Sequence, residues 1–339
     1  VARSDADQRA IEASRNAMTL TESALGDANE LLQQARETLL AAGNASYSDG
    51  ERASLAAKLE QLRAQLLAVA NRSAGAGAYV FGGQGFAGPP FVETATGVEY
   101  RGASGSLHGA GTEPLPLSVD GEAAWLLARS GNGSFVTGVV ASTTAWIDPG
   151  HVADPAALTG ANYEIAFGNG SYSVSRDGAP LAGHQDVPFV AGTAITVDGM
   201  AFRVGGAPAP GDRFAIAPST PGLDVFKVLD DAVAELRAPL RSHAEVMQTV
   251  TRSVRDLDAS LGALQGLRAA VGELLNRADN AEDRVAATRL HGQIDRSHAE
   301  DLDMVQAISE FQNQHTGYEA ALKTYSMVQR LSLFQYLGS

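Results

Sequence analysis

Glycine and proline are concentrated in the middle of the chain, and this distribution constrains the fold more than any other feature of the sequence. Of the 36 glycines, 27 lie between Gly75 and Gly222, as do 12 of the 13 prolines. These residues form turns and interrupt helices, so the middle is expected to differ in kind from its flanks. The sequence therefore predicts two helical flanks around a central β region.

The first flank carries apolar and small residues at alternating steps of three and four, the pattern of helices packed along a seam. A break at residues 43–51 divides the flank into two helices, and Ser48 or Asp49 is positioned to cap the second. Because the connection is short, the two helices are expected to lie antiparallel. The predicted seam consists of Ile11, Ser14, Met18, Thr21, Leu25, Ala28, Leu32, Ala35, Leu39, Leu55, Leu59, Leu62, Leu66 and Val69.

The C-terminal flank continues the same spacing from Val250 to Val285. A helix of this length needs partners along its whole apolar stripe, and the N-terminal pair offers matching stripes. The two ends of the chain are therefore predicted to pack together as one elongated bundle. Pro239 either bends one helix or separates two, and the sequence leaves both possibilities open.

The central region contains two hairpin signals. Alternating Tyr163, Ile165 and Phe167 precede an Asn-Gly turn at residues 169–170, and a second alternating run turns at Asp198-Gly199. These patterns predict an antiparallel β domain inserted between the helices, which makes the fold class α+β. The expected divisions are residues 1–101 and 223–300 for the bundle, 102–222 for the insert, and 301–339 for a terminal helix.

The stretch "YVFGGQGFAGPPF" contains Gly83, Gly85 and Gly88 in the spacing G-x-G-x-x-G, which occurs in dinucleotide-binding sites. Such sites need a helix after the glycines to hold the phosphate. Here prolines and a sequence suited to extended chain follow instead. We therefore expect no nucleotide and no other cofactor, and interpret the motif as a structural turn formed by Gly82, Gly83, Pro89 and Pro90.

Composition excludes several classes of partner and chemistry. The net charge of -14 opposes binding to nucleic acid or to anionic membrane surfaces. The absence of cysteine excludes disulfides and thiolate metal sites. No apolar run has the roughly 18 residues of a membrane helix. Position 1 is Val and begins a helical pattern without a leader, so we expect that an N-terminal segment is missing.

The sequence offers candidate chemical sites, but none has the positioned groups of an enzyme. His291, Asp295 and His298 share one helix face at a spacing that suits a metal, although a solvated polar face explains them better. We therefore predict no metal site and no catalytic residue. Asp148, Asp154 and Asp186 lie in turn-like contexts where aspartate accepts local backbone hydrogen bonds. Trp125 and Trp146 could line a pocket for a sugar.

The end of the chain does indicate a function. Large apolar side chains are distributed around most of its last predicted helix, so that one neighbour cannot cover them all. Their burial would contribute about 10–20 kcal/mol at most, comparable to the cost of bringing subunits together. The alternative is a helix folded back onto its own core. The predicted assembly surface consists of Leu322, Tyr325, Met327, Val328, Leu331, Leu333, Phe334 and Leu337.

With helical ends, a β insert and an assembly-competent terminus, the chain resembles the bacterial flagellin superfamily, and within it the hook-filament junction family, also called hook-associated protein 3. The resemblance is carried by "NRSAGAGAYVFGGQGFAGPPFV", "GTAITVDGMAFRVGGAPAPGDRFAIAPS", "HAEDLDMVQAISEFQ" and "LSLFQYL". It is diffuse between about Gly102 and Gly160. One feature of the family is absent here, an initial helix with an Asp-Asp-Pro motif that pairs with the C-terminal helix.

The resemblance implies an extracellular structural protein of the flagellum, exported by the flagellar type III apparatus with the help of an export chaperone. It implies a ring of like subunits on the hook-associated protein next to the hook, with flagellin on the filament side. The terminal helices would form the inner tube and the insert would project outward. Two alternatives remain: a filament-forming flagellin, whose tail more often ends in Leu-Leu-Arg, and a carbohydrate-binding or enzymatic β insert.

Overall fold

A computed structural model describes residues 2–336 except 76, 86–87, 110, 112 and 301–303. The chain divides into two compact units, which are described separately. One unit comprises Ala6–Glu282, and the other comprises Val1–Asp5 with Asp283–Ser339. The helices are α1 (Ala2–Ala42), α2 (Asp49–Ala70), α3 (Gly121–Trp125), the 3-10 turn η1 (Pro155–Ala157), α4 (Val225–Arg237), α5 (His243–Glu300) and α6 (Met304–Tyr336).

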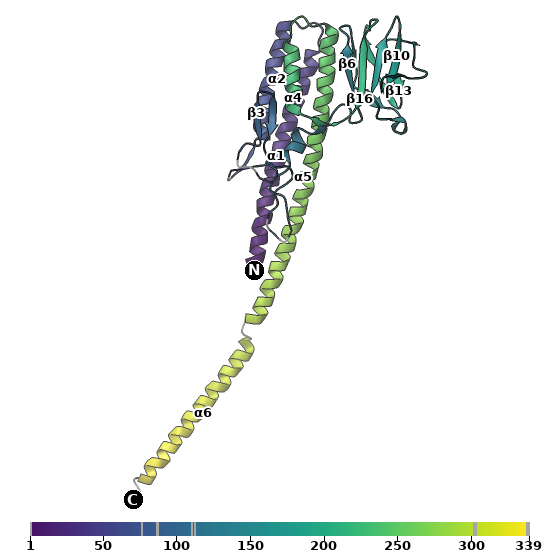
Figure 1. Cartoon of the computed structure of the whole chain (residues 1–339). Helices are drawn as coiled ribbons and strands as arrows, with labels where there is room; N and C mark the ends of the chain where they lie inside the picture. Colours follow the sequence, from purple (N-terminus) through teal and green to yellow (C-terminus); the bar gives the residue numbers. More distant parts are fainter. Residues whose placement is uncertain are drawn as a thin grey trace. The chain divides into compact units, whose positions relative to one another are not determined.

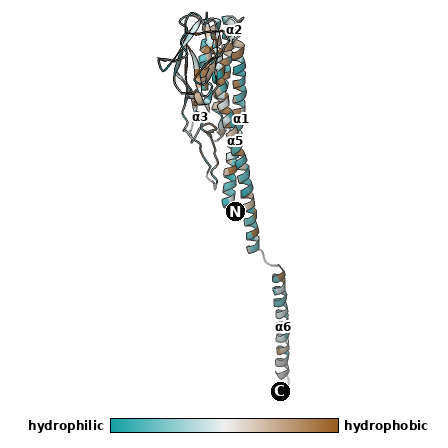
Figure 2. Cartoon of the chain, turned by 90° about the vertical axis from the view of Figure 1, so that its right-hand side faces the viewer, coloured by the Kyte–Doolittle hydropathy of each residue, from teal (hydrophilic) through white to brown (hydrophobic). Residues whose placement is uncertain are grey.

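The helices α1, α2, α4 and the first part of α5 form a bundle within the larger unit (Figure 1). All nine predicted seam residues of α1 are at most 4% exposed, and those of α2 are buried except for half-buried Leu55. Apolar positions gather between the helices (Figure 2). The predicted bundle of helices from both ends of the chain, with its seam, is confirmed.

Ion pairs on the bundle surface record how the helices run. Arg36 pairs with Asp258 at 2.7 Å, and Arg268 pairs with Glu22 at 2.5 Å. The residue later in α1, Arg36, thus pairs with the residue earlier in α5, Asp258, so these two helices are antiparallel. Exposed pairs of this kind contribute only about 0.2–1 kcal/mol each, so they fix register more than stability.

The turns between helices follow from specific caps. Ser48 caps α2 by a capping box in which its hydroxyl accepts the Glu51 amide at 3.3 Å and the Glu51 carboxylate accepts the Ser48 amide at 2.7 Å. The open question about Pro239 is answered by the structure: it separates two helices, because α4 ends at Arg237 and α5 begins at His243.

A polar cluster around Glu235 holds the corner between α4 and α5. Its carboxylate accepts hydrogen bonds from Thr249, Arg252 and Arg241, the last at 3.3 Å. Burial alone would raise the pKa of Glu235, but the hydrogen bonds from Arg252, Thr249 and Arg241 outweigh it and leave the pKa lowered. The ionised carboxylate therefore stabilises the folded corner.

Glu235→Gln should make the protein less sensitive to acid. Because the folded pKa lies below the ordinary value of 4.5, Glu235 contributes stability above that pH and loses it as the pH falls through the folded pKa. We expect the variant to unfold with about 1–3 kcal/mol less free energy at pH 7, and to lose less stability than wild type between pH 5 and 3. Denaturant melts at several pH values test this, with exposed Glu60→Gln as the control. Parallel pH profiles for Glu235→Gln and wild type would contradict it.

The strands form small antiparallel sheets, with β9, β10, β16 and β6 at the centre of the insert. Their bounds are β1 (Ser73–Gly75), β2 (Ala78–Tyr79), β3 (Phe91–Thr94), β4 (Gly97–Tyr100), β5 (Ala128–Arg129), β6 (Phe135–Ala141), β7 (Ala145–Ile147), β8 (His151–Val152), β9 (Tyr163–Phe167), β10 (Ser171–Arg176), β11 (Ala179–Pro180), β12 (Val187–Pro188), β13 (Ile195–Val197), β14 (Met200–Phe202), β15 (Val204–Gly206), β16 (Arg213–Pro218) and β17 (Pro221–Leu223).

Both predicted hairpins are confirmed. β9 pairs with β10, with Phe167 opposite Tyr172, and β13 pairs with β14 across the Asp198-Gly199 turn. Asp198 and Gly199 have φ of 41° and 80°, the left-handed values of the tight turn that this dipeptide favours. The insert has a hydrophobic core of its own, from Phe135 to Ile216, so the predicted α+β class is confirmed.

Trp125 belongs to the bundle rather than to this second core. It is 1% exposed, stacks on Phe226 with ring centroids 5.9 Å apart, and receives the edge of Phe81 at 5.3 Å. Val119 lies in the same cluster. The chain just after residue 102, predicted as part of the insert, therefore packs partly on the helices before the insert core begins at Phe135.

The glycine-rich stretch is a packing site for the backbone. Gly82 pairs with Asp120 and Gly83 with Ala103 in isolated β-bridges, and the next element is the strand β3 rather than a helix. The Tyr100 hydroxyl donates to the Phe81 carbonyl at 3.2 Å, and burial raises the pKa of Tyr100 to about 12. A Cβ on Gly83 would lie 2.8 Å from the same hydroxyl. The predicted extended chain after the glycines is confirmed.

Gly83→Ala should destabilise the protein far more than Gly85→Ala. Both glycines have positive φ, but the new Cβ at Gly83 would lie 1.6 Å from the Ala103 carbonyl oxygen, whereas at Gly85 nothing lies within 4 Å. We expect a loss of roughly 1–2 kcal/mol at Gly85 from backbone strain and about 3 kcal/mol or more at Gly83. Chemical denaturation measures both, and equal losses would mean that the close approach of the backbones is not needed.

Candidate functional site

The predicted assembly residues of α6 are exposed within the part of the chain that the structure describes. Leu322, Tyr325, Met327 and Val328 are between 50% and 64% exposed. Leu331, Leu333 and Phe334 belong to α6, but their side chains lie outside the described residues, as does the whole of Leu337. Whether these residues form an assembly surface stays a prediction, which their exposure favours.

The exposed apolar surface begins earlier than the sequence analysis expected. Met304, Ile308, Phe311 and Tyr318 are between 51% and 69% exposed. With Leu322 and Tyr325 they follow steps of four, three, seven, four and three, which is the spacing of a coiled-coil seam. This spacing could have been recognised in the sequence. The predicted assembly surface began only at Leu322, although the expected terminal helix, residues 301–339, already includes these positions and α6 begins at Met304.

The candidate chemical residues have structural positions. His291, Asp295 and His298 are exposed on α5, and the described residues contain no group of three His, Cys, Asp or Glu side chains able to hold a metal. Asp148 accepts the amides of Gly150 and Arg203 at 3.0 and 2.9 Å. The carboxylates of Asp148 and Asp154 thus accept local backbone hydrogen bonds, as expected for turns. Asp186 has a left-handed backbone, with φ of 52°.

The two tryptophans do not line a common pocket, contrary to the sugar-site hypothesis. Trp125 is enclosed in the bundle, as described above. Trp146 on β7 lies opposite Gly205 of β15, where an added Cβ would come within 2.6 Å of the indole ring. Its ring also meets His243 edge-on, with centroids 6.0 Å apart. Trp146 therefore covers a glycine strand and contacts the start of α5.

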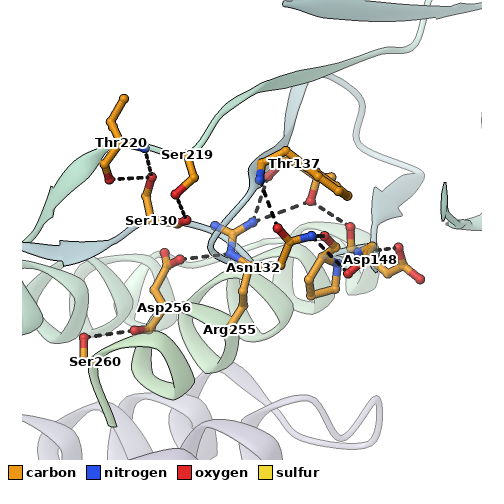
Figure 3. Close-up of polar contacts among 12 residues, drawn as sticks. Ser130, Asn132, Thr137, Asp148, Ser219, Thr220, Arg255, Asp256 and Ser260 are labelled. Carbon is orange, nitrogen blue, oxygen red and sulfur yellow. Dashed lines mark hydrogen bonds and ion pairs between the residues drawn. The ribbon is translucent and has the colours of Figure 1, made fainter. Parts of the chain in front are cut away.

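A buried polar contact joins the insert to α5 (Figure 3). The Arg255 guanidinium donates to the Thr137 carbonyl at 3.0 Å and to the Asp256 carboxylate at 2.9 Å. Thr137 on β6 in turn donates its hydroxyl to the Asp148 carbonyl at 2.7 Å. Arg255, Asp256 and Thr137 are all at most 9% exposed. A buried ion pair needs such additional hydrogen bonds to offset desolvation, so the geometry around Arg255 is tightly determined.

Two further side chains, one just before α5 and one within it, form hydrogen bonds with main-chain atoms of the insert. Ser242 donates to the Thr143 carbonyl at 2.7 Å, and the Gln248 side chain accepts the Ile147 amide at 3.0 Å. Together with Arg255, three polar side chains thus contact main-chain atoms of the insert. No local sequence pattern marks these three residues, because polar residues of the same types occur throughout the chain.

Side chains also hold the two segments that connect the bundle to the insert (Figure 3). Asn132 accepts the amides of Ser134 and Phe135 at 3.0 and 2.9 Å, and donates to the carbonyls of Pro149 and Gly150. Ser130 donates its hydroxyl to the Thr220 carbonyl at 3.1 Å and accepts the Thr220 amide at the same distance. The segment that enters the insert is therefore hydrogen-bonded to the segment that leaves it.

Arg255→Ala should destabilise the protein strongly, whereas Arg36→Ala should not. Removing Arg255 leaves the buried Asp256 carboxylate without its cation, which typically costs about 3–5 kcal/mol. Arg36 on α1 makes an exposed pair with Asp258, which lies on α5 like Arg255, and for its loss we expect about 0.2–1 kcal/mol. Calorimetric or denaturant unfolding measures the loss of stability in each variant. A small loss for Arg255→Ala would mean that this contact does not hold the insert against α5.

Comparisons with known proteins agree with this architecture. The family described as bacterial flagellin N-terminal helical region matches residues 1–85. Flagellar hook-associated protein 3 of Escherichia coli K12 is 25% identical over 323 residues, covering 94% of this chain and 76% of that protein. The crystal structure of hook-associated protein-3 from Legionella pneumophila has a TM-score of 0.78 at 26% identity, covering 91% of this chain and 96% of that one.

A further crystal structure, FlgL of Xanthomonas campestris, has a TM-score of 0.78 at 25% identity, covering 88% of this chain and all of that one. Fold and relatives together define a structural protein of the bacterial flagellum, built like flagellin and not an enzyme. Within that class, the chain is similar to proteins of the FlgL type, one of which, from Legionella pneumophila, is described as the flagellar junction protein. None of its described helices is long and apolar enough to cross a membrane.

Proposed function

We propose that this protein forms an adaptor ring that joins the hook to the flagellin filament. Like subunits contact one another around the ring, the neighbouring hook-associated protein lies on the hook side, and flagellin polymerises on the other side. The observation that carries this proposal is α6, whose apolar seam from Met304 to Tyr325 is exposed in the isolated chain. Such a helix needs a partner to be stable, and assembly supplies one.

The same proposal covers how the protein reaches its place. It leaves the cell through the flagellar type III apparatus, with an export chaperone, and remains extracellular in the flagellum. The α6 surface lies in the inner tube of the assembled structure, and the acidic insert faces outward. The net charge of -14 supports a chain that stays dispersed until specific contacts form.

A filament subunit is the second candidate, because residues 1–85 match the N-terminal helical region of flagellin. Immuno-electron microscopy of flagella carrying the protein separates the two, with label directed at the β9–β10 hairpin. A band confined to the boundary between hook and filament supports the junction. Label along the whole filament supports flagellin, and label absent from the organelle would overturn both.

Removing residues 318–339 should abolish incorporation into flagella and leave the thermal unfolding of the monomer nearly unchanged. The described side chains of this segment are exposed, so the bundle core loses nothing when they are deleted. Calorimetry and quantification of the protein in isolated flagella measure the two effects. A large fall in Tm would instead make the segment part of the monomer core.

Point variants give the matched control for that truncation. Leu322→Glu and Tyr325→Glu put a charge into the seam and should reduce incorporation at least 10-fold, because an unpaired charge in a buried interface is costly. Lys323→Gln alters an exposed polar position in the same turn of α6 and should incorporate normally. Equal incorporation of all three variants would contradict a role for the seam.

A further inference from the structure

Leu240 is the most exposed large apolar side chain in the described part of the larger unit, at 93%. It follows Pro239 in the corner between α4 and α5, where its φ is 58°. A leucine in this left-handed region is strained, and such strain persists only where the surroundings impose it. Both the left-handed backbone and the exposure of the apolar side chain to water are unfavourable to the stability of the isolated chain.

The strained conformation is held by the bundle itself. The Leu240 amide donates to the Asp49 carboxylate at 3.1 Å, and Asp49 is also paired with Arg52 in the first turn of α2. The Glu235 cluster fixes the corner on its other side through Arg241. Leu240 is therefore a rigid apolar knob beside the acidic N-terminus of α2, and its presentation costs the monomer stability.

A groove that suits an apolar knob lies in the same unit. It has a volume of about 790 Å³ and runs between α1, α5 and the loop that enters the insert. Leu40, Met247, Val250 and Val254 give it an apolar lining, and Leu40 is 49% exposed. Its α5 residues from Met247 to Ala263 span about 24 Å along the helix at about 1.5 Å per residue.

The charges around the two features are complementary. Arg129 lines the groove, is exposed, and makes no side-chain hydrogen bond or ion pair within the described residues. Asp258 on the same groove is already paired with Arg36. The Leu240 amide, in contrast, bonds to the Asp49 carboxylate, and Asp49, which is also paired with Arg52, and Glu51 make the first turn of α2 acidic. In a chain of net charge -14, an available arginine at this point favours a neighbour that carries carboxylates.

Knob and groove also have the positions that a ring requires. Subunits around a ring meet through two different patches, because a head-to-tail contact must be repeated by rotation. Leu240 lies beside the start of α2, whereas the groove lies between α1 and α5. The groove begins at Met247, four residues into α5 and so about 6 Å from its start, which gives the two patches similar heights along the bundle.

We propose that Leu240 of one copy inserts into the groove of the next copy around the ring, with Arg129 facing the acidic start of the neighbour's α2. This inference rests on the proposed ring, and it specifies the lateral contact of the bundle. It is independent of the α6 seam. The strain at Leu240 is then compensated on assembly, when its side chain leaves water.

Disulfide cross-linking tests the contact directly, because the chain contains no cysteine. Leu240→Cys is combined with a cysteine at Thr251, Ala259 or Ala263, and isolated flagella are oxidised. Within one chain, residue 259 lies about 24 Å along the helix from the start of α5, too far for a disulfide, which needs Cα atoms within about 7 Å. We expect covalent dimers and longer oligomers from at least one pair.

The controls make a negative result decisive. Val190→Cys, exposed on the insert, replaces Leu240→Cys in the control pairs and should give no oligomers. If label marks the junction but no Leu240 pair exceeds this control, the contact is wrong while the proposed ring stands. Dimers from Leu240→Cys alone would mean a two-fold contact and would overturn the proposal too. Label away from the junction would instead reject the proposed function.

A second variant separates assembly from folding. Leu240→Gly relieves the left-handed strain, so the Tm of the monomer should stay constant or rise by about 1–3 °C, while incorporation into flagella falls at least 10-fold. Leu240→Met keeps an apolar knob and should incorporate normally. Normal incorporation of the glycine variant would overturn the proposal, whatever its Tm.

Discussion

The apolar stripe of α5 is the constraint on which the rest of the structure depends. Its buried apolar residues run from Ala244 to Ala281, and a stripe of this length must be covered along most of its extent. α1 supplies that cover in antiparallel register, and α2 and α4 complete the bundle. Because α1 and α2 come from one end of the chain and α4 and α5 from the other, the segment that joins α2 to α4 can leave the bundle and must return to it. The insert is the consequence of this topology.

The attachment of the insert follows a different principle from the packing of the bundle. The helices meet through apolar side chains, whereas Ser242, Gln248 and Arg255 bind carbonyl and amide groups of the insert. Every residue type has a main-chain carbonyl and every type except proline has a main-chain N–H, so the insert sequence can change without loss of these bonds, provided that its backbone path is kept. This is consistent with relatives that share the fold at only 25–26% identity.

The features that the sequence predicted are those set by local periodicity and turn chemistry. The seam from Ile11 to Leu39, the Ser48 cap and the hairpin at Asp198-Gly199 each depend on neighbours a few residues away, and each was found. Trp125 and Arg255 depend on contacts across about 100 residues or more, with Phe226 and Thr137, and no local pattern announces such partners. The range of the exposed seam on α6 was missed for another reason. Its spacing was present in the sequence, but the predicted assembly surface began only at Leu322.

The buried apolar groups stabilise the single chain, whereas the exposed apolar groups of α6 are available for assembly. The seam and the aromatic cluster around Trp125 are buried within one chain, so they stabilise the monomer whatever its surroundings. α6 is 33 residues long, and several of its apolar side chains are exposed. A helix in a protein gains its stability chiefly from packing against neighbours. In the proposed ring, the partner that covers α6 supplies this packing, and part of the binding free energy is spent on fixing the helix. A subunit arranged in this way has a bundle core that is complete within one chain, while the apolar surface of its terminal helix is left for the proposed assembly.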